Sequence, residues 1–207
     1  MSETSPFLRD LRSCFAVSTA SPLGPITLVW GATEACHQLP DPSTHLYLLE
    51  LYFDDHEPQY LNPFLQQELK RQKKDSAWQT ALHRHPEIKQ ALLWLEQYFA
   101  GQKPEAELPE FVTFSTPFEL KVWQGITTIE YGTTISYGEL AQQLFPEQGK
   151  NMARAVGRAA GNNHIALMIP CHRVIGANGK LCGYAYGIER KRKLLELEAQ
   201  ACATKRK

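Results

Sequence analysis

The sequence predicts an α/β N-terminal domain, with a small antiparallel sheet and helices, followed by a mainly α C-terminal domain. Strand and helix patterns are mixed in residues 1–112, whereas helical patterns with short links dominate 113–207. Between these patterns, 102–116 contains prolines and has no helical period. A chain of 207 residues is long enough for such domains to bury cores without disulfide or metal staples. We therefore place the domain boundary between residues 112 and 113.

The N-terminal half alternates strand and helix signals. Its predicted elements are strands over 22–30 and 45–53, a loop over 31–44, and helices over 61–74 and 86–100. The strands are rich in apolar and β-branched residues, and the loop contains Gly, Pro, Asp and Ser. The last helix has the clearest limits, because Pro86 suits a first helical turn and Gly101 suits a C-terminal stop.

The C-terminal half contains helical patterns joined by short links. Its predicted helices cover 117–129, 137–144 and 151–161, and a turn covers 145–150. Ser136 and Glu139 form a capping-box pattern at the start of the second helix. Because a short turn joins the second and third helices, the pair suggests a helix-turn-helix.

The third of these helices carries a basic face that fits nucleic acid. Arg154 and Arg158 share this face, and a strip of small residues that includes Gly157 runs beside it. An Arg pair beside small side chains lets a helix approach a phosphate backbone closely. The same pattern fits an ordinary solvated face with Ala chosen for helix propensity, so the helix alone leaves both interpretations open.

The net charge of zero hides an uneven distribution. Residues 1–112 carry 9 basic and 15 acidic side chains, whereas 113–207 carry 13 basic and 7 acidic ones. The sequence thus predicts an acidic half and a cationic working half. No apolar run approaches the roughly 18 residues of a membrane span, and MSETSPFLRDLRS has no signal-peptide core. With five widely spaced cysteines and no CxxC pair, we expect a cytoplasmic location (nuclear in a eukaryote) and no disulfide framework.

The segment with the most chemical information is IPCHRVIG at 169–176. A reactive cysteine must be held as thiolate by a cation, a base or oriented donors, and Cys171 is followed by His172 and Arg173. On an extended strand these neighbours point apart, so His172 would reach the thiol only through a bend or a water. The alternative is a buried cysteine that acts as a small hydrophobe.

A third group must orient the histidine. In the C-terminal helix, Glu198 lies on the apolar face with Leu194 and Leu195, apart from the basic, solvated stretch Arg190–Lys193. A carboxylate on a buried stripe needs a partner, and His172 would complete a Cys–His–Glu relay. The competing interpretation is a frayed helix end with Glu198 in water. The last residues, ACATKRK, are expected to be disordered.

Together these segments resemble the O6-alkylguanine-DNA alkyltransferase family (methylated-DNA–protein-cysteine methyltransferases). The matching motifs, in order, are SPLGPITL (21–28), PFELKVWQ (117–124), ISYGELA (135–141), ARAVGRAAGNN (153–163) and IPCHRVIGANGKLCGYAYGIERKRKLLELE (169–198). They cover most of 117–198, whereas 31–112 resembles the family only loosely. The resemblance implies a ribonuclease-H-like N-terminal domain and DNA repair by direct damage reversal. The partner it implies is double-stranded DNA with O6-alkylguanine, and also O4-alkylthymine; we expect a monomer without cofactor or membrane contact.

The resemblance also assigns roles to residues around the nucleophile. Cys171 is similar to the cysteine that accepts the alkyl group as a stable thioether, so the protein acts once. His172 resembles the base that acts through a water, and Glu198 matches the carboxylate that orients it. Asn163 matches the asparagine that braces the turn leading to the cysteine.

Further matches concern the DNA. The target atom lies inside the duplex, so the base must be flipped out. Tyr137 matches the tyrosine that helps to rotate the target nucleotide, and Arg154 matches the arginine that fills the gap left in the stack. Gly157 and Arg158 belong to the face that the family places in the minor groove. Tyr184 looks like the pocket tyrosine that faces the guanine.

Two departures from the family pattern stand out. Members commonly carry Gly-Gly or Ser-Gly after the pocket tyrosine, whereas this chain has Ala185 and Tyr186, so we expect a narrower pocket mouth. Some relatives hold a structural zinc with N-terminal Cys and His. The available side chains do not fit the spacing of that site, so we expect no metal; they are Cys14, Cys36, His37, His83 and His85.

Three other functions compete with alkyl transfer. A non-enzymatic, alkyltransferase-like lesion-binding protein would carry another residue, often Trp, at the position of Cys171. A helix-turn-helix regulator would more often add a dimerisation helix or an effector domain, and neither is visible. A cysteine hydrolase would need an oxyanion-hole signature, which we do not identify in the sequence.

Overall fold

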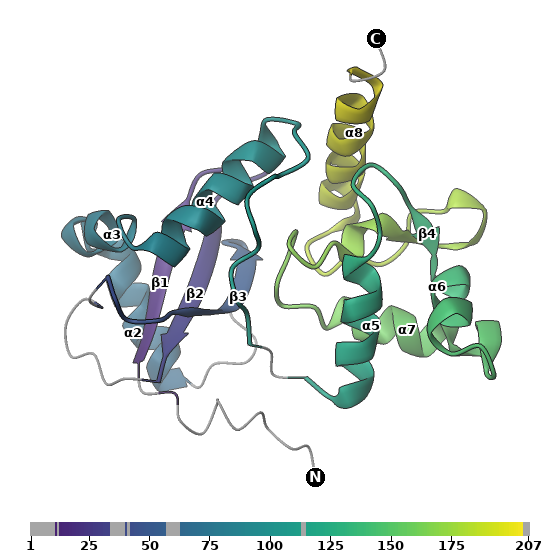
Figure 1. The fold of residues 1–207 in the computed structure, drawn as a ribbon, viewed down its shortest axis with the longest axis horizontal. Coiled ribbons are helices and arrows are strands. Elements are labelled where there is room, and N and C mark those ends of the chain that lie inside the picture. Colours follow the sequence, from purple (N-terminus) through teal and green to yellow (C-terminus); the bar gives the residue numbers. More distant parts are fainter. Residues whose placement is uncertain are drawn as a thin grey trace. The chain divides into compact units, whose positions relative to one another are not determined.

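The structure, a computed structural model, describes residues 11, 13–33, 40, 42–56, 63–112 and 115–204. The chain divides into two compact units, which are described separately below (Figure 1). The first comprises Met1–Ala100 and Pro104–Phe114, and the second comprises Gly101–Lys103 and Ser115–Lys207. Among the described residues, no helix combines the length and apolar character that a bilayer span requires.

The first unit is built on a small antiparallel sheet, as the sequence predicts, and this sheet has three strands where two were predicted. Its strands, in spatial order, are β1 (Ser13–Thr19), β2 (Ile26–Ala32) and β3 (Tyr47–Phe53). Every residue of the central strand β2 is buried, and its Trp30 lies opposite Phe15 of β1. Strand β1 was not predicted, because its apolar residues are bounded by Ser and Thr rather than by Gly or Pro.

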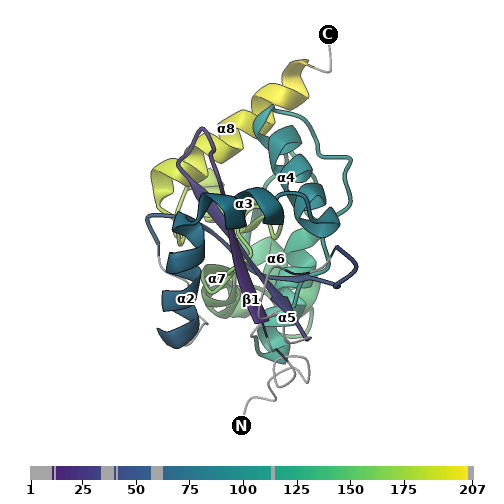
Figure 2. The same ribbon diagram turned by 90° about the vertical axis from the view of Figure 1, so that its left-hand side faces the viewer.

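Helices complete the first unit and cover the free edge of β1. They are α2 (Pro63–Lys74), α3 (Ser76–Leu82) and α4 (Pro86–Phe99), and α2 and α3 pack on β1 (Figure 2). Two glutamines from these helices bond to the strand. Gln72 accepts from the Ala16 N–H at 3.1 Å, and Gln79 accepts from Ser18 N–H at 3.0 Å and donates to the Ala16 carbonyl at 2.7 Å. These side chains satisfy an edge that would otherwise be open to pairing.

The predicted limits of α4 are confirmed, and the chain that follows it has a structural role. Pro86 occupies the first turn, and Gly101 follows the C-cap with φ 71°. The stretch 110–112 then runs beside β3. The Leu48 N–H donates to the Glu110 carbonyl at 2.9 Å, and the Val112 N–H donates to the Leu48 carbonyl at 3.0 Å. Part of the proline-containing link therefore covers the second edge of the sheet.

The second unit is mainly helical. Its helices are α5 (Pro117–Thr127), α6 (Tyr137–Leu144), α7 (Ala153–Gly161) and α8 (Ile188–Thr204), with 3-10 turns η1 (Gly149–Met152), η2 (Cys171–Arg173) and η3 (Ala177–Gly179). Two short parallel strands, β4 (Ile135–Ser136) and β5 (Val174–Ile175), complete it. The Ser136–Glu139 capping box is confirmed. Trp123 of α5 donates to the Ala159 carbonyl of α7 at 2.7 Å and so joins these two helices.

The structure bears on two expectations for this unit. Cys171 lies in the 3-10 turn η2, so the backbone bends between Cys171 and His172. Helix α8 continues through Thr204, so the first four residues of ACATKRK are helical rather than disordered. Residues 205–207 lie outside the described part of the chain.

Candidate active site

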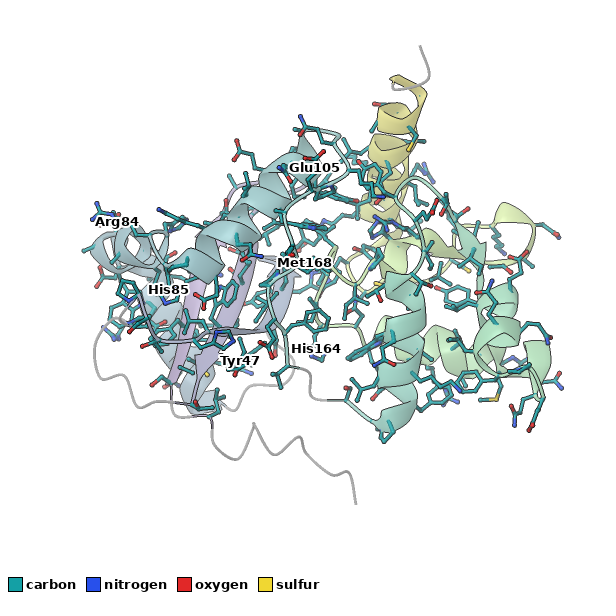
Figure 3. The ribbon with its side chains drawn as sticks, in the orientation of Figure 1. Tyr47, Arg84, His85, Glu105, His164 and Met168 are labelled. Atoms are coloured by element: carbon teal, nitrogen blue, oxygen red, sulfur yellow. The ribbon has the colours of Figure 1, made fainter. Side chains whose placement is uncertain are left out.

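Cys171 is buried at the start of η2, and Asn163 ties this turn to the chain that precedes it. Asn163 Nδ2 donates to Cys171 Sγ at 3.1 Å and to the Ile169 carbonyl at 2.8 Å. Its Oδ1 accepts from the Ile165 N–H at 3.0 Å. One amide side chain thus fixes both ends of the buried loop 165–169 and contacts the sulfur itself. His164 and Met168, labelled in Figure 3, belong to the same connection between α7 and η2.

His172 meets Glu198 of α8 inside the second unit. His172 Nε2 lies 2.8 Å from Glu198 Oε1, and neither side chain is exposed. The interpretation of Glu198 as a frayed, solvated residue is therefore wrong. Burial lowers the pKa of His172 below its ordinary value, and the charges of Arg173 and Lys191 add to this effect against the opposing influence of Glu198. The imidazole is consequently neutral at pH 7.

Glu198 has further partners that the sequence analysis did not identify. Arg173 Nε donates to Oε2 at 3.0 Å, Arg173 Nη2 donates to Oε1 at 3.1 Å, and the Gly132 N–H donates to Oε2 at 2.9 Å. Burial would raise the pKa of Glu198, but the hydrogen bonds and charges of His172 and Arg173 lower it to about 2. Arg173, expected to act on the thiol, is instead bound to this carboxylate.

The cation that acts on the thiol is Lys191. The prediction that Lys191 belongs to a solvated basic stretch is wrong, because Lys191 is 0% exposed. Its Nζ donates to the carbonyls of Val174 at 2.6 Å, Cys182 at 3.1 Å and Gly183 at 3.1 Å. Lys191 precedes Glu198 by two helical turns, so the periodicity that predicts a buried Glu198 also predicts a buried Lys191. That signal was present in the sequence.

The surroundings of Cys171 favour a thiol in the resting protein. Burial raises the pKa of Cys171 above its ordinary value, while the Asn163 hydrogen bond and the Lys191 charge oppose the rise. A nearby base is therefore needed to form the thiolate. The neutral His172, oriented by Glu198, has the chemical character of such a base.

Three tyrosines, Tyr137, Tyr184 and Tyr186, lie in the same unit as Cys171 and His172. The Tyr184 ring lies 6.4 Å from the His172 ring and 5.6 Å from the Tyr186 ring, both edge-on. Among the described residues, the buried Tyr184 hydroxyl has no hydrogen-bond partner. Burial, together with Cys182 and Cys171, raises the pKa of Tyr137 to about 12, so this phenol is protonated at neutral pH and can donate a proton. Tyr186, expected at a pocket mouth, is buried against Tyr184.

Of the residues predicted to contact DNA, Tyr137 begins α6, and Arg154, Gly157 and Arg158 lie on α7. Arg154 and Arg158 are exposed, and Arg158 also borders a hollow of about 440 Å³ that Asn162 helps to line. Gly157 faces α6, because a Cβ at this position would lie 3.7 Å from the Tyr137 ring. The structure thus brings Gly157 and Tyr137 together and keeps both arginines accessible.

The residues considered for zinc are only partly described. Cys36 and His37 lie outside the described residues. Cys14 is buried in β1, His83 Nδ1 lies 2.6 Å from the Gln79 carbonyl, and His85 Nδ1 lies 2.7 Å from Glu87 Oε2 (Figure 3). In the described part of the chain, no three His, Cys, Asp or Glu side chains are grouped to hold a metal ion.

The comparisons with known proteins agree with this arrangement. The family model "6-O-methylguanine DNA methyltransferase, DNA binding domain" matches residues 117–200. The methylated-DNA–protein-cysteine methyltransferase of Mycobacterium tuberculosis is 53% identical over 104 residues, which cover 50% of this chain and 61% of that relative. The Mycobacterium leprae protein of the same name is 47% identical over 115 residues, which cover 56% of this chain and 67% of that relative.

The similarity extends to solved structures. The crystal structure of Mycobacterium tuberculosis OGT in complex with DNA matches with a TM-score of 0.63 and 36% identity, covering 90% of this chain and 94% of that chain. The family model lies in the half that contains Cys171, and the structural match covers 90% of the chain. The chain therefore belongs to the family of 6-O-methylguanine DNA methyltransferases, the methylated-DNA–protein-cysteine methyltransferases.

Proposed function

We propose that this chain repairs alkylated DNA by moving the alkyl group of O6-alkylguanine from a duplex to its own Cys171, irreversibly and once per molecule. The observation that carries the proposal is the buried Cys171 thiol, held by Asn163 and followed directly by the His172–Glu198 pair. The names of the mycobacterial relatives support it, since they specify methylated DNA as donor and a protein cysteine as acceptor.

The transfer needs a thiolate and a leaving purine that is protonated. His172 takes the thiol proton through Nδ1, by way of a water, because Nε2 is bound to Glu198. The sulfur attacks the alkyl carbon, the new S–C bond forms as the C–O6 bond breaks, and the electron pair goes to the purine. Tyr137 donates a proton to the purine, and the proton held by His172 restores the tyrosine. The products are an S-alkylcysteine and an unmodified guanine.

We assign recognition of the duplex to the second unit. In this proposal α6, η1 and α7 form the helix-turn-helix, which enters the minor groove with Gly157 and Arg158 on its DNA-facing side. Tyr137 helps to rotate the target nucleotide, and Arg154 fills the gap in the base stack. Arginine suits this role because its guanidinium is long, planar and cationic.

The pocket for the flipped base is assigned to Tyr184, Ala185 and Tyr186. The buried Tyr184 hydroxyl supports this assignment, because a polar purine or pyrimidine edge would satisfy it. The proposal also includes O4-alkylthymine as a substrate, a ribonuclease-H-like first domain over residues 1–112 and a monomeric protein. The proposal also keeps the cytoplasmic location expected from the sequence, because the proposed substrate is DNA.

A single experiment tests the central proposal. The protein is incubated with a duplex that carries one O6-methylguanine and is then weighed intact by mass spectrometry. We expect one added methyl group per protein molecule, mapped to Cys171 by peptide analysis. Cys171→Ala should abolish the gain, whereas the matched control Cys202→Ser should retain it, because Cys202 lies near the far end of α8.

The other outcomes identify the competing functions. Tight lesion binding without a mass change would indicate a lesion-binding protein, and binding without preference for the lesion would indicate a regulator. Repeated turnover with an unmodified cysteine would indicate a hydrolase. Each of these results contradicts the alkyl-transfer proposal.

A further inference from the structure

Lys191 is a buried cation whose hydrogen bonds join two separate stretches of the chain. Its ammonium has three N–H donors and binds three backbone carbonyls, at 2.6, 3.1 and 3.1 Å. Burying an ammonium carries a large desolvation penalty, which only well-placed partners offset. A lysine that only contacts solvent would not need to be buried. The buried position of Lys191 therefore indicates a specific role for its ammonium.

The acceptors of Lys191 lie in two stretches of the chain, one directly after the reacting turn and one directly before Tyr184. Val174 lies in β5, directly after the turn that contains Cys171 and His172. Cys182 and Gly183 directly precede Tyr184, and Gly183 has a left-handed φ of 51°. The ammonium thus joins the stretch that presents the thiol to the stretch that presents the pocket tyrosine.

The ammonium charge also acts on both members of the proton transfer. It opposes the rise in the pKa of Cys171, and it lowers the pKa of His172. The effect on Cys171 favours the thiolate, whereas the effect on His172 makes the imidazole a weaker proton acceptor, so we attribute the contribution of Lys191 to its effect on the thiol. Reciprocally, burial lowers the pKa of Lys191, and the charges of Cys171 and Cys182 oppose that change.

Other titratable groups surround Lys191 and Cys171. They are Tyr137 from α6, whose ring centroid lies 5.8 Å from Lys191 Nζ, Cys182 and Tyr184 from the loop before α8, Arg173 from η2, and Arg190 and Glu198 from α8. Arg173 and Glu198 bind each other, so their charges largely compensate. Of these cations, Lys191 is therefore the one whose removal should change the pKa of the Cys171 thiol most.

We propose that Lys191 is a positioning residue for alkyl transfer, which stabilises the Cys171 thiolate by its charge and holds the 182–183 stretch against β5 by its hydrogen bonds. This inference rests on the proposed function only for its link to repair. The effect on the thiol is independent of DNA.

The test compares Lys191→Met with Lys191→Arg and with Lys193→Met, an exposed neighbour on the same helix. Cys171 is labelled with iodoacetamide over a series of pH values, and labelling is quantified on the Cys171 peptide. We expect Lys191→Met to raise the pH midpoint by about one unit, since an opposite charge nearby typically lowers a thiol pKa by that amount or more. Lys191→Arg and Lys193→Met should leave the midpoint near that of the wild type.

The rate of methyl transfer from O6-methylguanine duplex is measured in parallel at pH 7. Lys191→Met should be about tenfold slower, because tenfold less thiolate is present. An unchanged labelling midpoint in folded Lys191→Met overturns the inference. If Cys171 of the wild type is labelled normally but takes no methyl group from DNA, the proposed function is wrong. The labelling series then still tests the charge effect of Lys191 on the thiol.

A measurement on the wild type avoids the risk that Lys191→Met does not fold. The Lys191 side chain is titrated by nuclear magnetic resonance before and after Cys171 is methylated. Methylation removes the ionisable sulfur, so the Lys191 titration midpoint should fall. An identical midpoint in the two forms overturns the inference.

Discussion

Glu198 is the acceptor at the centre of the buried polar network, and its ionisation links that network to stability. Its pKa is about 2 in the folded protein, against an ordinary value of 4.5. Because the folded pKa is depressed, the ionised carboxylate contributes stability above about pH 4.5, and this contribution is lost as the pH falls toward 2. At neutral pH it amounts to about 3 kcal/mol.

The corresponding prediction concerns acid sensitivity. The free energy of unfolding, measured by urea titration, should fall between pH 5 and about pH 2 in the wild type. Glu198→Gln should be less stable at pH 7 by about 3 kcal/mol, since Arg173 stays buried without its anion, and should lose most of this pH dependence. Glu196→Gln, at an exposed position of α8, is the control and should behave as the wild type. A wild-type pH profile in Glu198→Gln would contradict the prediction.

Tyr186 tests the size of the proposed pocket. This residue is 6% exposed, and its ring packs edge-on against Tyr184. We expect Tyr186→Gly to react faster with O6-benzylguanine relative to O6-methylguanine than the wild type does, because space opens beside Tyr184. Single-turnover rates for both adducts give the ratio, and Tyr186→Phe should keep the wild-type ratio. Equal benzyl-to-methyl ratios in Tyr186→Gly and the wild type would exclude a steric role for this ring.

At the scale of the elements, α6 depends on its N-terminal cap. Ser136 accepts from the Glu139 N–H at 3.1 Å, and Glu139 accepts from the Ser136 N–H at 2.9 Å. Removing the Ser hydroxyl in Ser136→Ala should destabilise the protein by about 1 kcal/mol, measured by urea denaturation. Gln143→Ala, on an exposed position of α6, should change stability much less. Equal losses for the two variants would show that the capping box does not stabilise this helix.

The DNA-contacting role proposed for helix α7 can be separated from the reaction at the thiol by comparing duplex and free-base substrates. Arg154 is exposed on α7, whereas the thiol is buried in η2. Arg154→Ala should therefore retain its rate with free O6-benzylguanine but lose about tenfold or more with O6-methylguanine in a duplex. Rates are measured by intact mass on both substrates. Equal losses on the two substrates would argue against a role in filling the base stack.

At the scale of the whole molecule, charge is divided between the two halves of the sequence. The net charge of zero conceals −6 over residues 1–112 and +6 over 113–207, from the 9 basic and 15 acidic side chains of the first and the 13 and 7 of the second. A cationic surface that binds phosphates releases counterions, so affinity falls as salt rises.

This gives a prediction for undamaged duplex DNA. The dissociation constant, measured by fluorescence anisotropy in a salt series, should rise steeply with salt concentration. Arg158→Ala should reduce the slope of log Kd against log salt by about one. Lys89→Ala, which removes an exposed cation of the first unit, should leave the slope unchanged. A smaller slope in Lys89→Ala than in Arg158→Ala would contradict the assignment of DNA binding to the second half.

Local patterns predicted much of this protein. The two later strands of the sheet and the limits of α4 and α6 follow from apolar periodicity, Pro86, Gly101 and the Ser136 capping box. The strand β1 was missed because it has no strong boundary signal, and the short helix α3 was missed although Asp75 is an N-cap signal at its start. These elements form because they pack on neighbours, as when Gln72 and Gln79 bind the edge of β1.

The sequence by itself determined which residue types are present for the chemistry: Cys171 beside His172, and a glutamate on the apolar face of the last helix. Only the tertiary structure decided how they are paired. Arg173 binds Glu198 instead of the thiol, and the Lys191 ammonium binds three backbone carbonyls, because both side chains face inward where an unpaired charge is costly. The direction of a charged side chain depends on which partners the fold brings within reach, and those partners are distant in sequence.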